Sequence, residues 1–365
     1  METPRGVALL ASLALLAAGA AAFAPQPLSS ARLQRSAAPR QSCAAAAAAA
    51  AVFDKAARPA DACVLAPAKV NLFLRILRRR EDGYHELASL FQALELGDTL
   101  RVWRLDERAT STMELVWDDG ADAAAERPEV PTDGSNLVLR AFELFARQVG
   151  MPLRVHVELT KRIPVQAGMG GGSADAAAAL FAANRLCGYP ASMADLRAWG
   201  AELGSDISFF FSTGTAYCTG RGEQIESLPP LEPRREIYVL KPAEGLSTAL
   251  VYRTLDLGAL SRLDPDALLA GMRRAGGLLE PANFVNDLEP PALAAVPRLA
   301  DIQRTLRARG WRVVMMSGSG TSIFCIGSPA GEPPLAGWSD ELRAACFPTR
   351  FASRAEDDET VWYGE

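Results

Sequence analysis

PVQAGMGGGSAD, residues 164–175, is the stretch around which the rest of the chain is organised. Before it, residues 153–160 carry an apolar side chain at every second position, as a half-buried strand does. After it, residues 176–187 are alanine-rich and end at Gly188, a pattern typical of a helix and its C-terminal stop. The glycines therefore join a predicted strand to the start of a predicted helix.

A glycine loop in this position suits a phosphate group. Glycine allows positive φ and lets a ligand approach the backbone amides, and a helix start adds unpaired N–H groups and a positive dipole end. The stretch lacks the Gly-Lys-Ser/Thr ending of a Walker loop and the acidic strand end of a dinucleotide site. A flexible connector is the alternative, but the position between strand and helix favours phosphate binding.

The first part of the chain is predicted to be an address rather than a folded segment. Residues 1–22 combine Arg5 with an alanine- and leucine-rich run, as a signal peptide does. Residues 23–59 are predicted to be a transit peptide and low-complexity linker, because they are rich in Arg and Ser and the chain has no acidic residue between Glu2 and Asp54. The order resembles the bipartite presequence of algal plastids with extra membranes, and we expect a location in the plastid stroma. Secretion is the alternative, but the six cysteines form no Cys-x-x-Cys pair and indicate free thiols in a reducing compartment.

Composition argues against two classes of partner. The net charge is −5 and no basic block is present, so nucleic acid is not expected to bind. No apolar run after the presequence is long enough to span a bilayer, so no membrane association is expected after processing.

Three polar residues are candidates for chemistry. Lys69 and Asn71 share one face of a predicted strand; a solvated surface is the usual explanation, and a phosphate or hydroxyl contact is the functional one. Asp206 lies between a helix-stop glycine and the apolar run 207–211, so it is either a partly buried base or the N-cap of the next helix. Two distant histidines, His85 and His156, offer no convincing zinc site.

Other elements are predicted from local signals. Residues 87–103 are expected to form two strands around a Gly97-Asp98 turn. Asn136 is expected to cap a helix that stops at Gly150, and Ser192 to cap another. The second glycine-rich loop, residues 317–321, is by itself best explained as a tight turn between buried strands.

Several motifs together carry a resemblance to a known family. In order along the chain, the motifs Pro67–Leu72, the glycine loop with Ser173, Leu203–Asp206 and Met316–Thr321 resemble those of the GHMP small-molecule kinase superfamily. Within it, Asp82–Glu86, Gly220–Glu223 and Asn286–Glu289 resemble the 4-diphosphocytidyl-2-C-methyl-D-erythritol kinases. The match covers about residues 62–326.

The resemblance implies an α+β fold of two domains, the first ribosomal-protein-S5-like and the second ferredoxin-like. The N-terminal kinase domain would span residues 60–228, the C-terminal one residues 229–355, and a tail residues 356–365. The implied activity is phosphorylation of the 2-hydroxyl of a cytidylated methylerythritol, on the non-mevalonate route to isopentenyl diphosphate. The cofactors would be ATP and Mg²⁺, and the enzyme would be a monomer or homodimer.

The resemblance also assigns roles to residues. Asp206 would take the hydroxyl proton, and Lys69 would stabilise developing charge. The residues that would hold the cytidine end are Asn71, Tyr84, His85 and Tyr252. A C-terminal loop would close the site, namely Ser317, Gly318, Ser319, Gly320 and Thr321. ATP would lie along Pro164, Val165, Gln166, Ala167, Gly168, Met169, Gly170, Gly171, Gly172, Ser173 and Ala174.

Three departures from the family pattern bear on ATP. Gln166 stands where a glycine is expected, and Ala174 and Asp175 stand where the family usually has Ser and Asn. Asp175 adds a negative charge near the expected triphosphate. Two other functions stay open: a superfamily kinase for another alcohol, such as homoserine or mevalonate, and a non-catalytic nucleotide-binding homologue.

Overall fold

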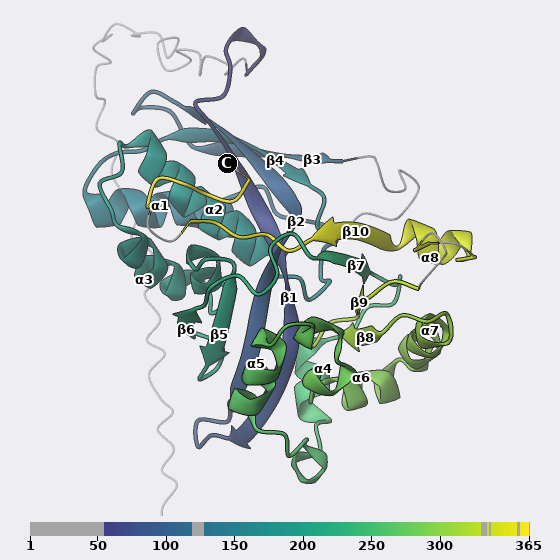
Figure 1. Cartoon of the computed structure of the whole chain (residues 1–365). Coiled ribbons are helices and arrows are strands. Elements are labelled where there is room, and N and C mark those ends of the chain that lie inside the picture. The colour runs from purple at the N-terminus through teal and green to yellow at the C-terminus, as the bar shows by residue number, and fades with distance from the viewer. Residues whose placement is uncertain (1–54, 119–127, 330–333, 336, 356–357, 365) are drawn as a thin grey trace, which may run out of the picture. The chain divides into compact units, whose positions relative to one another are not determined.

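Two long antiparallel strands, β1 (Ala62–Arg79) and β2 (His85–Arg104), form the centre of the fold (Figure 1). The computed structural model describes residues 55–118, 128–329, 334–335, 337–355 and 358–364. The predicted signal peptide and most of the predicted transit segment lie outside the described residues, as do residues 119–127. No helix in these ranges is long and apolar enough to cross a membrane.

The larger sheet of the described chain has six strands, in the order β3-β4-β2-β5-β6, with β1 paired to β2. Two strands pair with different parts of β2: β4 with residues 99–104 and β5 with residues 89–92. Strand β3 runs parallel to β4. The bounds are β3 (Thr112–Trp117), β4 (Val155–Lys161), β5 (Thr215–Thr219) and β6 (Gln224–Ser227).

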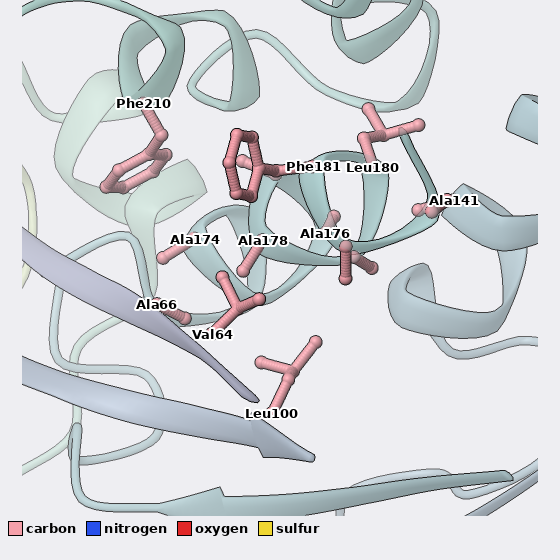
Figure 2. Close-up of a cluster of buried hydrophobic side chains, with 14 of the residues drawn as sticks. Val64, Ala66, Leu100, Ala141, Ala174, Ala176, Ala178, Leu180, Phe181 and Phe210 are labelled. Atoms are coloured by element: carbon pink, nitrogen blue, oxygen red, sulfur yellow. The ribbon is translucent and has the colours of Figure 1, made fainter. Parts of the chain in front are cut away.

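One alanine-rich helix fills the space above this sheet. Helix α2 (Gly171–Leu186) is buried on all sides from Ala174 to Asn184, because alanine side chains are small enough for strands and neighbouring helices to approach closely. Val64, Ala66 and Leu100 project from the strands toward this helix (Figure 2). The helices that pack against α2 are α1 (Leu137–Val149), α3 (Met193–Leu203) and the 3-10 helix η2 (Ile207–Phe211).

The helix ends follow the predicted capping signals. The Asn136 side chain accepts the Val138 N–H, and Gly150 ends α1 with φ of 67°. Ser192 and Asp195 form a capping box at α3. The predicted caps at Asn136 and Ser192 are both confirmed. Such caps depend on hydrogen bonds between residues no more than three apart in sequence.

The second sheet of the described chain has four strands, in the order β10-β7-β9-β8. The predicted boundary at residue 228 falls between β6 and β7, which belong to different sheets. The strands are β7 (Glu236–Leu240), β8 (Val313–Met316), β9 (Ile323–Ile326) and β10 (Cys346–Arg350). The helices are α4 (Thr248–Arg253), α5 (Pro265–Arg273), α6 (Glu289–Ala295), α7 (Pro297–Ala308) and α8 (Asp340–Ala344). Short 3-10 turns are η1 (Lys55–Ala57), η3 (Leu257–Ala259), η4 (Gly277–Leu279) and η5 (Pro281–Asn283).

The two sheets share a core in this mixed α/β fold, which agrees with the predicted α+β class. Val70 and Leu72 of β1 pack in one cluster with Val239 of β7 and Phe324 of β9. Strand β1 therefore serves both halves, and its middle is buried on both faces. The five described cysteines are free thiols, as the sequence predicts.

One prediction about the sheet is wrong. Residues 85–104 form one continuous strand, without a turn at Gly97-Asp98. An added Cβ on Gly97 would lie 2.7 Å from the Ala66 carbonyl oxygen, so this glycine serves close backbone approach to β1. The Asp98 carboxylate accepts the N–H groups of Arg162 and Ile163 instead of making a turn.

Candidate active site

The glycine loop connects β4 to α2, as predicted, and its backbone is left-handed at several positions. Gly168 and Gly170 both have φ of 72°, and Gly170 is the N-cap of α2. No side chain caps this helix start. The first-turn N–H groups of α2 are therefore available to an anion.

Gln166, the first departure from the family pattern, lies in the same strained region with φ of 56°. A non-glycine residue in this conformation costs roughly 1–2 kcal/mol. The loop conformation is kept even where glycine is absent.

A cavity of 440 Å³ lies against this loop. Its wall contains every residue from Pro164 to Ser173, together with an apolar side made by Val130, Pro131 and Leu137. Ala174, in contrast, is fully buried in the core and does not line the cavity, while Asp175 does. An apolar wall beside a row of helix-start amides suits a flat base attached to phosphates.

Asp175 does not present an isolated charge to this cavity. It is buried, and its carboxylate lies 2.9 Å from the Lys161 ammonium, which also binds Asp98. Burial and the nearby Asp98 carboxylate raise the pKa of Asp175 well above its usual range. Burial alone would lower the pKa of Lys161, but the two carboxylates raise it overall. The negative charge noted in the sequence is therefore balanced inside the protein.

Lys69 and Asp206 meet beside the loop. The Lys69 ammonium lies 3.5 Å from the Asp206 carboxylate, and it also lies over the Phe91 ring, 4.3 Å from its centre. Lys69 is buried, whereas the Asp206 side chain is 37% exposed. Asp206 precedes η2, but its side chain makes no capping hydrogen bond. The carboxylate is therefore directed to the cavity side, paired with a buried cation.

Asn71 supports Lys69 from the same strand. Its Oδ1 accepts from the Lys69 ammonium at 3.0 Å, and its Nδ2 donates to the Ser89 hydroxyl at 2.9 Å. Lys69 and Asn71 do share a face of β1, but that face is buried instead of solvated. Asn71 lines one cavity together with Lys69 and Tyr252, and it is not part of the cavity that Tyr84 and His85 line.

Three of the predicted substrate residues, Tyr84, His85 and Tyr252, line a second cavity, of 580 Å³. The rings of His85 and Tyr252 lie 5.2 Å apart, while Tyr84 is 57% exposed. Burial, with a smaller effect of Arg79, lowers the pKa of His85, so its imidazole is held neutral. Burial, with Asp206 nearby, raises the pKa of Tyr252 to about 12, so its hydroxyl keeps its proton.

Arg221 is a site residue that sequence reasoning did not assign. Its guanidinium lies over the Tyr84 ring, 5.0 Å from the centre, in the second cavity. Its motif, Gly220–Glu223, was part of the family resemblance, but nothing local distinguished Arg221 from a surface arginine. Arg221 and Tyr252 also line a third cavity, of 280 Å³, together with Lys69, Asp206 and the loop residues Gly168 and Gly170. The third cavity thus shares walls with both others, and the Lys69–Asp206 pair lies on it.

The second glycine loop is both a turn and part of the site. The loop connects β8 to β9, and a hydrogen bond from the Ser317 N–H to the Ser322 carbonyl closes the turn. The Ser317 hydroxyl accepts the Asn71 N–H at 3.1 Å, and Ser319 contacts Thr248. An added Cβ on Gly320 would lie 2.9 Å from the Ala167 carbonyl oxygen, so the two glycine loops touch backbone to backbone.

The described side chains contain no group of three or more His, Cys, Asp or Glu that could hold a metal ion. The lining of the third cavity includes Asp206, Thr248 and Ser319, whose side chains carry oxygen atoms of the hard class that Mg²⁺ prefers.

Comparison with known proteins gives concordant matches. Residues 136–214 match the family model "GHMP kinases N terminal domain" and residues 257–336 match "GHMP kinases C terminal". The chain is 40% identical over 308 residues to the chloroplastic 4-diphosphocytidyl-2-C-methyl-D-erythritol kinase of Mentha piperita, covering 83% of this chain and 72% of the relative. It is 42% identical to the kinase of that name from Protochlamydia amoebophila, covering 80% of this chain and 91% of the relative. A solved structure, titled 4-(cytidine 5'-diphospho)-2C-methyl-D-erythritol kinase, superposes with a TM-score of 0.64 at 35% identity, covering 80% of this chain and all of that one.

Proposed function

Because the chain belongs to the 4-diphosphocytidyl-2-C-methyl-D-erythritol kinase family of GHMP kinases, we propose that it transfers the γ-phosphoryl group of ATP to the 2-hydroxyl of 4-diphosphocytidyl-2-C-methyl-D-erythritol. The observation that carries this proposal is the Lys69–Asp206 pair, on a cavity that shares its walls with the glycine-loop cavity on one side and the aromatic cavity on the other. A kinase needs this order: nucleotide, reacting groups, acceptor.

ATP would bind with its base against the apolar wall near Leu137 and its phosphates along Pro164 to Ser173. The uncapped first turn of α2 supports this, since its N–H groups and dipole favour the negative phosphates. Mg²⁺ would accompany ATP, held by phosphate oxygens, and would supply further neutralisation of charge.

The acceptor hydroxyl would lie at Asp206. The hydroxyl oxygen attacks the γ-phosphorus of ATP, and the hydroxyl proton passes to the Asp206 carboxylate. The bond from the γ-phosphorus to the bridging oxygen breaks, which releases ADP. Lys69, 3.5 Å from that carboxylate, would pair with it before transfer and oppose the negative charge of the phosphoryl group. Asn71 would hold Lys69 in position, since its Oδ1 accepts from the ammonium. The cytidine contact that the family resemblance implied for Asn71 stays a prediction beside this role.

The cytidine end would occupy the aromatic cavity, where Tyr84, His85 and Tyr252 offer ring faces and hydrogen-bonding edges. A base that stacks on aromatic side chains gains about 1–3 kcal/mol. Arg221, between this cavity and Asp206, would hold the diphosphate that joins the base to the methylerythritol.

Two rival functions are disfavoured by named features. A homoserine or mevalonate kinase would have no base to place against Tyr252 and His85. A non-catalytic homologue would need neither Lys69 nor Asp206, which are retained and paired. We further propose import into a plastid through the bipartite presequence, supported by the chloroplastic Mentha piperita relative and the Arg- and Ser-rich segment.

The test is a competition in which cytidylated methylerythritol, methylerythritol 4-phosphate, mevalonate and homoserine are supplied at equal concentration with ATP, and phosphorylated products are identified by mass. We expect the cytidylated substrate to be consumed, and Asp206→Asn to lower turnover by about two or more decades with substrate affinity retained. Faster use of mevalonate or homoserine would refute the substrate assignment. An unchanged turnover in Asp206→Asn would refute its role as the base.

A further inference from the structure

The segment that follows β10 returns from the smaller sheet to the larger one. We call residues 351–355 and 358–364 the C-terminal strap. Phe351 forms an antiparallel bridge with Leu94 of β2, and the Ala352 N–H donates to the Ala93 carbonyl at 2.9 Å. The Arg354 N–H then donates to the Thr213 carbonyl at 3.0 Å. The strap is therefore bonded to the backbone of the larger sheet and of the segment after η2.

Arg354 binds the C-terminal end of η2. Its side chain is buried, the residue being 8% exposed. The guanidinium donates to the Phe211 carbonyl at 2.6 Å and to the Ser212 carbonyl at 2.8 Å. The last carbonyls of a helix lack partners within the helix, and a cation at this end also opposes the helix dipole. Arg354 thus satisfies and fixes the end of a five-residue helix.

The aromatic residues of the strap connect η2 to the helix of the glycine loop. Trp362, 1% exposed, stacks on Phe181 of α2 with ring centres 4.6 Å apart, and its ring lies 5.6 Å from Phe211. The Tyr363 hydroxyl donates to the Ser212 carbonyl at 3.2 Å. The sequence assigned residues 356–365 to a tail, yet these two rings are part of the core.

Asp206 stands at the opposite end of η2. No side-chain cap holds that end, and the helix is only about 10 Å long at the 3-10 rise per residue. Phe209, Phe210 and Phe211 are fully buried, so η2 is packed tightly along its length. In so short and tightly packed a helix, a displacement at the Phe211 end is expected to reach Asp206.

We propose that Arg354 is a positioning residue for Asp206: the C-terminal strap fixes η2 at one end so that the carboxylate at the other end stays in line with the acceptor hydroxyl. The inference rests on the proposed function for its effect on turnover, but its structural part concerns η2 alone. A misplacement of about 1 Å in a catalytic group lowers the rate about 10²-fold, so a modest loosening of η2 is enough to be measured.

The experiment compares Arg354→Met, Arg354→Lys and a control, Arg350→Met, in the full chain. Arg350 belongs to neighbouring β10, is half-exposed, and pairs with Glu236 on the surface. Steady-state kinetics are normalised to the folded fraction. We expect Arg354→Met to lower kcat by about 10- to 100-fold with the KM for ATP within about twofold. Arg354→Lys should recover part of this loss, because lysine can still donate to one carbonyl.

Hydrogen–deuterium exchange supplies a readout independent of activity. We expect peptides covering residues 205–213 to exchange faster in Arg354→Met than in Arg350→Met, with peptides from α1 unchanged. The inference is overturned if kcat of Arg354→Met matches that of the control, or if exchange rises equally throughout the protein. If the unmodified chain shows no kinase activity, the proposed function fails, and the exchange result still decides whether Arg354 fixes η2.

Discussion

Gly320→Ala tests whether the contact between the two glycine loops sets the shape of the nucleotide cradle. An added Cβ would lie 2.9 Å from the Ala167 carbonyl oxygen and 2.9 Å from the Gly168 Cα. Ordinary contacts begin near 3.4 Å, so the loops must separate by about half an ångström, and the opposing atoms are backbone that cannot rotate away. Gly320 does not have positive φ, so alanine adds the methyl group without backbone strain.

The size of the effect follows from that displacement. Overpacking of this kind costs about 1–3 kcal/mol in the free energy of unfolding. If 1 Å of misplacement costs about 10²-fold, half that distance predicts a decrease of about tenfold in kcat/KM for ATP. The assays are steady-state kinetics with ATP varied and urea denaturation followed by circular dichroism.

Gly245→Ala is the matched control, because Gly245 is exposed, lacks positive φ and has no atom within 4 Å of the added Cβ. It should change neither quantity. A Gly320→Ala enzyme with the stability and the ATP kinetics of this control would refute the view that the loops support each other.

Three further predictions follow from named contacts. Lys161→Met leaves two buried carboxylates without their cation and should lower the free energy of unfolding by about 3–5 kcal/mol. Asp175→Asn removes one of the two negative charges and should change this free energy little. Equal decreases for the two variants in urea denaturation would contradict the prediction. Gln166→Gly should raise the free energy of unfolding by about 0.5–1 kcal/mol by relieving left-handed strain, and a lower denaturation midpoint would argue against it. Burial lowers the pKa of His85 below 6.5, so the unfolded chain takes up a proton there before the folded chain does, and the free energy of unfolding should fall as the pH drops below about 6.5. His85→Asn should flatten this part of the pH profile. Urea midpoints that change equally with pH in both proteins would contradict the prediction.

Local features of the fold could be predicted from the sequence because a few neighbouring residues determine them. The caps at Asn136 and Ser192 depend on hydrogen bonds within three residues. The glycine loop depends on a strand period, a run of glycines and an alanine-rich helix, all adjacent in the chain. These signals act before any tertiary contact forms.

Features that depend on distant partners could not be predicted in the same way. Gly97-Asp98 reads as a turn, but Gly97 serves an approach to Ala66 and Asp98 receives N–H groups from Arg162 and Ile163. No residue near Asp98 in the sequence indicates that its carboxylate accepts N–H groups from Arg162 and Ile163. The Asp175 charge was likewise noted without Lys161 of β4, whose ammonium pairs with it and with Asp98 of β2.

The candidate site shows the same division. Lys69 and Asp206 were candidates from local sequence, with roles implied by the family resemblance, and only the structure brings them within 3.5 Å. The family resemblance assigned Asn71 to the substrate, and only the structure shows that its amide also contacts Lys69 and Ser89. No local sequence signal marks Arg221 as a site residue, because its proximity to Tyr84 and to the third cavity depends on the turn after β5.

The strap also has a consequence for the order in which the chain matures. The Trp362 indole donates to the Leu65 carbonyl at 2.7 Å across 297 residues of sequence. A nascent chain that has emerged only as far as β6 has all strands of the larger sheet, yet it lacks the ring that covers Phe181. Contacts of such long range slow folding, because loop-closure entropy is spent before they form. The larger sheet should therefore stay open to proteases and chaperones until synthesis has passed residue 363, even though its own strands were made much earlier.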